Sequence, residues 1–157
     1  MTIDDRFVNG ERFIKWNDKA RTSIRQPTVR GSYAITLLVD KNGHILYWKK
    51  RGEDDIAYVF IEDIVDVRIG KYALAEGIDN IDDVNTVMTI VTNVDFTHPR
   101  FYTFKHKKSA GSVLAWSQFL FDLSQRRRRE VHGQFFYLQK FFAPFRYVSV
   151  HETVPID

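Results

Sequence analysis

The 157-residue chain contains no cysteine, which excludes disulfide frameworks, cysteine zinc sites, thiol nucleophiles and iron–sulfur clusters. No run approaches the roughly 18 apolar residues of a membrane-spanning helix, and the acidic start lacks the basic and apolar regions of a secretory signal. Glycine and proline are scarce, at 8 and 4 residues, whereas 44% of the chain is hydrophobic. The composition therefore predicts a soluble, intracellular protein with one folded domain and a short appendage.

The sequence patterns of common catalytic and metal sites are also missing. The five histidines form no HExxH motif and no pair four residues apart, and GxSxG, GxxxxGK[ST] and GxGxxG do not occur. The segment 40–51 lacks the glycine and the glutamate that a calcium loop needs at its sixth and twelfth positions, so a simple turn is the better interpretation. We therefore predict a binding module with no catalytic residue, no metal site and no cofactor of its own.

Positive charge is concentrated in one part of the chain. Residues 100–146 hold ten Lys or Arg against two acids, including Lys107, Lys108 and the run Arg126–Arg129. This density favours an anionic partner such as a membrane surface, a nucleic acid or an acidic protein face. The alternative is a solvated helix end whose arginines complement the helix dipole. Because aromatic and basic residues do not interleave around Phe101 and Tyr102, we predict no nucleic-acid partner.

The middle of the chain has the composition of short strands joined by tight turns. The predicted strands are residues 33–39, 44–48, 58–61, 64–69, 86–91 and 101–104, which are rich in β-branched and aromatic residues. Asn42 and Gly43 supply the positive φ angles of a hairpin turn between the first two of these strands. Within 64–69, partial alternation predicts one apolar face made by Val65, Val67 and Ile69.

The periodicity changes to that of a helix after residue 108. Ser109 is a predicted N-cap, and the apolar residues that follow recur at steps of three and four: Val113, Trp116, Leu120 and Leu123. A second helix is predicted over about 131–142, with Pro144 ending it. Its many aromatic residues predict packing against a further domain, with a membrane-lying helix as the alternative.

Strands followed by one amphipathic helix with an inward tryptophan resemble the pleckstrin-homology fold. That fold is mainly β, a seven-stranded antiparallel two-sheet sandwich or barrel capped by a C-terminal α-helix, with Trp116 at the position of the core tryptophan. More specifically, Arg12–Trp16, Asn42–Trp48 and Ile61–Ala73 resemble the N-terminal pleckstrin-homology domain of phosphoinositide-specific phospholipases C, nearest to the beta class. Residues 135–156 are similar to the start of the EF-hand region that follows in those enzymes.

This resemblance implies a division of the chain into three parts. Residues 1–10 would be an N-terminal extension and residues 11–125 the pleckstrin-homology domain. Residues 126–157 would be a linker and the first helix of a truncated EF-hand region, an extra helix after the fold. The catalytic barrel of the parent enzyme, with its calcium, would lie outside this chain, so the chain alone is not expected to hydrolyse lipid.

The resemblance also implies a function, a location and partners. The domain would associate with the membrane and dock G proteins for an enzyme that hydrolyses phosphatidylinositol 4,5-bisphosphate in signal transduction. Its implied place is cytoplasmic, peripheral at the inner face of the plasma membrane. Implied partners are anionic lipids (phosphoinositides weakly), a Rac-type GTPase or G-protein βγ, and the downstream EF-hand and catalytic domains. The alternative is a stand-alone adaptor domain that binds a protein or peptide without lipid.

Candidate lipid-binding residues follow from the family pattern. Members that grip phosphoinositides use a basic residue on the first strand, which Lys15 matches, and a Lys/Arg-x-Arg pattern opening the second, which residues 31–34 lack. The predicted substitutes are the loop residues Lys19, Arg21, Arg25 and Arg30, and Lys49, Lys50 and Arg51 after the hairpin. At about 1 kcal/mol for each base near an anionic leaflet, they predict weak, salt-sensitive association. Alternatively, the loop charges are only solvated.

Overall fold

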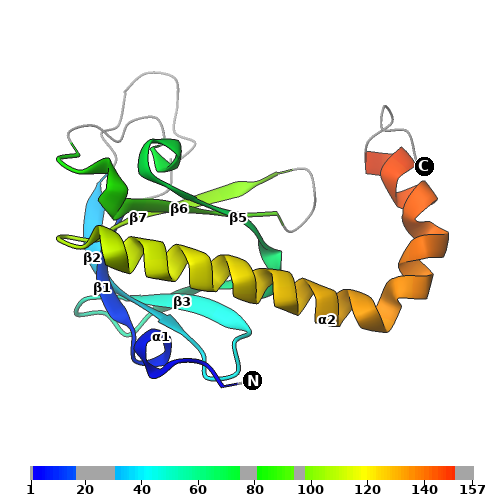
Figure 1. Ribbon diagram of the computed structural model, residues 1–157, viewed down its shortest axis with the longest axis horizontal. Helices are drawn as coiled ribbons and strands as arrows, with labels where there is room; N and C mark the ends of the chain where they lie inside the picture. Colours follow the sequence, from blue (N-terminus) through cyan, green and yellow to red (C-terminus); the bar gives the residue numbers. More distant parts are fainter. Residues whose placement is uncertain (1, 17–30, 75–80, 94–97, 151–157) are drawn as a thin grey trace.

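The computed structural model describes residues 2–16, 31–74, 81–93 and 98–150, with residues 131–150 described as backbone only. The chain forms a seven-stranded sheet, and Figure 1 shows this sheet with short helices around it and one long C-terminal helix. The strands are β1 (Glu11–Trp16), β2 (Ser32–Val39), β3 (Ile45–Lys50), β4 (Ile56–Phe60), β5 (Ile64–Ile69), β6 (Val87–Thr92) and β7 (Arg100–Lys105). The helices are α1 (Asp5–Asn9), η1 (Ile61–Asp63), η2 (Gly70–Ala73), η3 (Val84–Thr86) and α2 (Ala110–Val150).

The seven strands form two layers that meet at β1. Their order is β4-β3-β2-β1-β7-β6-β5, and every pair is antiparallel. β1 pairs with β2 along its whole length but with β7 only through Ile14↔Lys105 and Lys15↔Phe104. The β1–β4 and β5–β7 layers therefore diverge from this short junction and enclose the core between them. The predicted seven-stranded, mainly β fold with a C-terminal helix is confirmed.

The hairpin between β2 and β3 turns at the predicted Asn42–Gly43 pair. Gly43 has φ +72°, the left-handed region that favours glycine. Asp40, the first residue of the segment considered and rejected as a calcium loop, organises the turn: its carboxylate accepts the backbone N–H groups of His44 at 2.6 Å and Ile45 at 2.7 Å. These bonds satisfy donors that the short turn leaves without a strand partner.

The first part of α2 closes one end of the two layers with the apolar face predicted from its periodicity. The four predicted residues are at most 4% exposed: Val113, Trp116, Leu120 and Leu123. The Trp116 ring meets Phe7 and Phe13 edge-on, with centroids 4.8 and 6.0 Å away. Ser109 Oγ accepts the backbone N–H of Ser112 at 3.0 Å, which confirms the predicted N-cap.

The first ten residues, predicted as an extension, contribute to the core. Ile3 and Phe7 are buried, and the Phe7 ring stacks on Phe119 with centroids 3.8 Å apart. Gly10, at φ +87°, then turns the chain so sharply that a Cβ there would lie 2.8 Å from the Leu37 carbonyl oxygen. The short helix α1 was not predicted, because five residues carry too little periodicity to reveal it. The proposed domain boundaries themselves stay a prediction.

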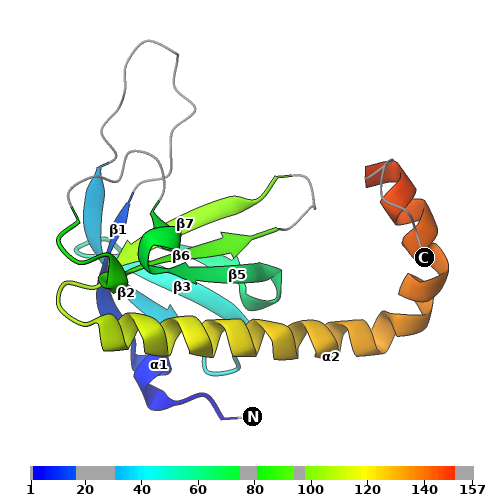
Figure 2. The same ribbon diagram turned by 45° about the horizontal axis from the view of Figure 1, so that its top comes forward.

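Two expectations about the C-terminal helix were wrong. α2 is one helix from Ala110 to Val150, with no break near residue 126 and no end at Pro144. A proline removes one backbone hydrogen bond and can bend a helix without ending it; Figure 2 shows α2 running beside β5 and then changing direction in its last part. The aromatic side chains predicted to pack against a further domain lie outside the described side chains.

The Arg126–Arg129 run is therefore in the middle of a helix, and its interpretation as a solvated helix end was also wrong. Arg127 Nε donates to the Gly43 carbonyl at 2.9 Å, and Arg127 also donates to the Asn42 carbonyl. Arg128 donates to the Ile64 carbonyl at 2.9 Å. Two of the four arginines thus attach α2 to the β2–β3 turn and to the start of β5.

The apolar face predicted for β5 is observed only in part: Val67 packs against the core, but the alternation does not hold along the strand. Ile64 is fully buried, whereas Ile69, expected on the apolar face, is 37% exposed. The pairing of β5 with β6 shifts between Ile64 and Asp66, so one residue is extra at that point. Such a bulge changes which side chains face the core, and strict alternation fails across it.

Because Trp116 is fully buried between α1, β1 and α2, Trp116→Ala should lower the free energy of unfolding by about 3–5 kcal/mol. Urea unfolding followed by circular dichroism measures this. Leu114→Ala is the control on the same helix: Leu114 is 46% exposed, and its removal should change stability by about 0.5 kcal/mol or less. Equal losses in the two variants would contradict the packing described.

Candidate functional site

Lys15 is the only predicted lipid-binding residue on β1, and the strand turns its side chain inward. Phe13 and Lys15 are two residues apart, so both face the same side of the strand, and each is only 2% exposed. Lys15 lies opposite Tyr33 of β2 and Phe104 of β7. Lys15 thus lies at the β1–β7 junction, two residues further along β1 than the core residue Phe13.

Aromatic rings surround the Lys15 ammonium group. Nζ lies 5.6 Å from the ring centroid of Trp48, 5.7 Å from that of Tyr102 and 5.8 Å from that of Tyr33. It also donates to the Trp16 carbonyl at 2.9 Å. A buried cation is tolerable only with such partners, because the ring faces and the carbonyl replace part of the lost hydration.

A second cation reaches the same tyrosine from β3. Lys50 Nζ lies 5.1 Å from the Tyr33 ring centroid and 3.2 Å from Glu53 Oε1. Lys50 is opposite Ile35 on β2, so it shares a face with Tyr33, which is two residues earlier in that strand. Unlike Lys15, it is exposed to solvent. We call Lys15, Tyr33, Trp48, Lys50 and Tyr102 the cation–aromatic cluster.

The predicted site residues fall into three groups. Lys15 and Lys50 meet around Tyr33, and Lys49 and Arg51 are exposed at the end of β3 and just after it. The four predicted loop bases, Lys19, Arg21, Arg25 and Arg30, lie outside the described residues. Their role in binding stays a prediction, as does that of the others.

The aromatic members of the cluster were missed as site residues. Tyr33, Trp48 and Tyr102 were given no part in lipid binding. The available signal was the spacing of Phe13 and Lys15, which puts a lysine on the face of a strand that buries a phenylalanine. A lysine at such a position needs nearby aromatic or anionic partners.

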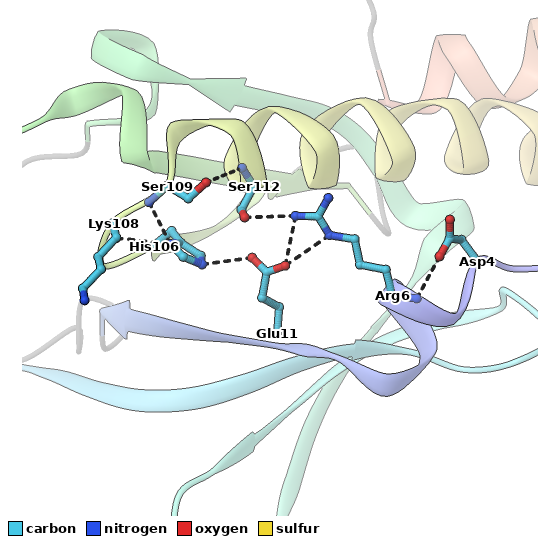
Figure 3. Close-up of polar contacts among 7 residues, drawn as sticks. All are labelled: Asp4, Arg6, Glu11, His106, Lys108, Ser109 and Ser112. Carbon is cyan, nitrogen blue, oxygen red and sulfur yellow. Dashed lines mark hydrogen bonds and ion pairs between the residues drawn. The ribbon is translucent and has the colours of Figure 1, made fainter.

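A second polar cluster joins α1, β1 and the start of α2 (Figure 3). Arg6 donates to Glu11 Oε1 through Nε at 3.2 Å and through a terminal nitrogen at 3.1 Å, and to Ser112 Oγ at 2.9 Å. His106 Nε2 lies 3.0 Å from Glu11 Oε2, and His106 Nδ1 accepts the backbone N–H of Ser109 at 3.0 Å. Each side chain here holds another element in place, so the cluster is structural.

The surroundings of Glu11 decide its protonation. Partial burial raises the pKa of its carboxyl, but hydrogen bonds from Ser112 and Arg6 and the charges of Arg6 and His106 outweigh burial. The net pKa of Glu11 is lowered from its ordinary value of 4.5. The ionised carboxylate therefore stabilises the folded state, as expected where charged hydrogen bonds converge.

No group of three or more His, Asp or Glu that could hold a metal ion occurs among the described residues. Likewise, none of the helices searched over the described ranges is both long and apolar enough to cross a membrane. The cation–aromatic cluster brings two ammonium groups to one tyrosine ring, an arrangement whose chemistry suits an anion or a polar protein surface.

Comparison with known proteins gives a consistent picture. The family model described as "PH domain" matches residues 2–130. The 1-phosphatidylinositol 4,5-bisphosphate phosphodiesterase beta-2 of Mus musculus is 30% identical over 114 residues, which are 65% of this chain and 9% of that protein. The Homo sapiens protein of the same name is 29% identical over 121 residues, 69% of this chain and 9% of that protein. The chain thus spans less than a tenth of these relatives.

A solved structure supports the fold. The crystal structure of S. officinalis PLC21 superposes with a TM-score of 0.62 at 21% sequence identity, over 78% of this chain and 16% of that chain. At this identity the likeness shows the fold alone. Together with the two curated relatives, it confirms the predicted resemblance to the pleckstrin-homology domain of beta-class phospholipases C.

The lowered pKa of Glu11 predicts an acid-dependent loss of stability. A carboxyl with a depressed folded-state pKa stabilises the protein above its unfolded-state pKa, and this contribution is lost as pH falls through the folded-state value. Glu11→Gln should therefore lower stability at pH 7 by about 1–2 kcal/mol and flatten the decline below about pH 5. Thermal melts from pH 7 to pH 3 measure both effects.

Glu53→Gln is the matched control for this pH dependence. The Glu53 ion pair with Lys50 is half exposed, with side-chain exposures of 52% and 46%, and pairs of this kind contribute little to stability. If Glu11→Gln and Glu53→Gln gave the same pH profile as the unaltered chain, the assigned role of the Glu11 cluster would be wrong.

Proposed function

The chain belongs to the PH-domain family, and from this premise we propose that it is a non-catalytic membrane-association and protein-docking domain of a phosphoinositide-specific phospholipase C. The relatives' printed name describes an enzyme acting on phosphatidylinositol 4,5-bisphosphate. We extend that activity to the parent protein only, with its calcium and its catalytic barrel outside these residues. The proposed place is the inner face of the plasma membrane.

The observation that carries the proposal is the meeting of Lys15 and Lys50 around Tyr33. β1 ends and β2 begins beside this cluster, and the sequence that joins them contributes four more bases: Lys19, Arg21, Arg25 and Arg30. An anionic headgroup at this cluster would meet two ammonium groups that lie near one tyrosine ring. Charge-assisted bonds from ammonium groups to an anion are stronger than hydrogen bonds between neutral groups.

The same cluster supports weak rather than headgroup-specific binding. Where the family pattern requires bases at the opening of the second strand, this chain has Tyr33, whose ring contacts both lysines. Lys50 is also partly neutralised by Glu53. Affinity would then come mainly from summed charge near the leaflet, which decays within a Debye length and weakens with salt.

One observation favours the alternative, an adaptor domain that binds protein without lipid. Lys15 is 2% exposed and already has a hydrogen bond and three ring contacts, so it can serve as a structural residue. Within the leading proposal, a Rac-type GTPase or G-protein βγ is the protein partner. Its support is the similarity to the beta-2 phosphodiesterases.

The decisive experiment is vesicle sedimentation. We expect the chain to bind vesicles containing phosphatidylserine, to bind phosphoinositide vesicles of equal charge about as well, and to be released by high salt. Lys15→Met and Lys50→Met should each weaken binding about fivefold, the loss of about 1 kcal/mol per base. Equal partitioning onto neutral and anionic vesicles would contradict the proposal and favour the adaptor.

Lys41→Met is the matched control for the two lysine variants. Lys41 is exposed in the β2–β3 turn, at the far end of the strands that carry Tyr33 and Lys50, and its removal changes the net charge by the same amount. Its binding should stay near that of the unaltered chain. Circular dichroism of each variant separates a binding defect from a folding defect.

A further inference from the structure

The two edge strands of the sheet differ in how far other elements cover them. The strand order ends at β4 on one side and β5 on the other. β5 packs along α2, which covers that edge. β4 pairs with β3 alone, and no other strand in the described part of the chain lies along its outer side. An edge strand of this kind presents backbone N–H and C=O groups to any chain that can pair with it.

The exposed side chains of β4 are unusually apolar. Ile56, Tyr58 and Phe60 are 49%, 56% and 47% exposed, and they alternate along the strand, so they share one face. The Tyr58 and Phe60 rings contact each other edge-on, with centroids 5.7 Å apart. We call these three residues the β4 edge patch. A monomeric protein seldom leaves three aligned large apolar residues at an open edge without a use for them.

Acidic residues stand at both ends of the patch. Asp54 and Asp55 precede β4, and Glu62 and Asp63 follow it after Ile61, within η1. Asp54, Asp55 and Glu62 form no ion pair with any residue that the structure describes. At Asp63, burial and, after it, the charge of Glu62 raise the pKa of the carboxyl.

This charge pattern argues against pairing with a second copy. Two β4 strands joined antiparallel about Tyr58 would bring the acids that precede β4 in one copy toward the acids of η1 in the other. Like charges facing each other across a strand pair are destabilising. The acids thus select against the chain itself and in favour of a strand with basic ends.

We propose that the β4 edge binds an extended segment of a partner protein, added as a further strand, with apolar residues at alternate positions and Lys or Arg at both ends. Backbone hydrogen bonds to β4 would supply affinity, and the β4 edge patch and its flanking acids would supply selectivity. The cations Lys49 and Lys50 lie on β3, across β4 from the added strand, and Lys50 pairs with Glu53. The proposal is independent of lipid binding.

Titration of the whole chain with synthetic peptides tests this. The probe is Lys-Lys-Val-Thr-Val-Thr-Val-Lys-Lys, and the control peptide has Glu in place of every Lys. We expect the basic-ended peptide to bind, measured by fluorescence anisotropy, with amide chemical-shift changes centred on residues 56–60. N-methylation of alternate peptide nitrogens, which removes strand hydrogen bonds but keeps the side chains, should abolish binding.

Charge reversal on the protein provides the matched variants. Asp54→Lys/Asp55→Lys should weaken the basic-ended peptide about tenfold and strengthen the acidic-ended one, because two attractions become repulsions. Asp82→Lys/Asp122→Lys makes the same charge change at exposed positions on the β5–β6 connection and on α2. This control should leave the affinity for both peptides unchanged. Tyr58→Lys should weaken binding of the basic-ended peptide, because it removes the central apolar side chain of the β4 edge patch.

Several outcomes would overturn the proposal. Equal binding of the two peptides, shift changes away from β4, or unaltered binding after N-methylation would each exclude a basic-ended added strand. A concentration-dependent dimer without peptide, removed by Tyr58→Lys in analytical ultracentrifugation, would assign the edge to a second copy instead. Uptake onto neutral vesicles that Tyr58→Lys abolishes would assign it to a lipid surface.

Discussion

The short junction between β1 and β7 is the constraint on which the rest of the architecture depends. Only two residue pairs join these strands, so the β1–β4 and β5–β7 layers are attached to each other there along a short stretch. Trp116 and the apolar face of α2 are buried in the core between the layers. Lys15 lies at the junction itself, among its aromatic partners, one of which, Trp48, belongs to the same core. The core and the candidate site are therefore continuous.

β1 links the core and the candidate site through its alternation. Phe13 and Lys15 occupy the same face of this short strand. Phe13 contacts Trp116, and Lys15, two residues nearer the end of β1, contacts Trp48. The lysine ammonium contacts three ring faces and donates to the Trp16 carbonyl. Ring faces stabilise a cation in a buried place, where much of its hydration is lost.

Much of this was predictable from the sequence, for physical reasons that differ by element. The β2–β3 hairpin and the inner face of α2 followed from local signals, namely the Asn42–Gly43 turn and the three-and-four spacing around Trp116. The bulge in β5 was not predictable, because one extra residue in a strand does not change its composition. Likewise, the long-range roles of Arg127 and Arg128 depend on carbonyls far away in the chain. The sequence of four arginines does not indicate whether each side chain faces solvent or bonds to another strand.

The docking of Arg127 and Arg128 has a practical consequence for dissection of the molecule. A fragment that ends at residue 125, just after the last apolar residue of the capping face, would keep Trp116 but lose both Arg127 and Arg128. The carbonyls of Gly43 and Ile64 would then have to bond to water, and the β2–β3 turn would lose its hydrogen bonds to α2. Truncations intended to isolate the lobe should retain at least one further helical turn.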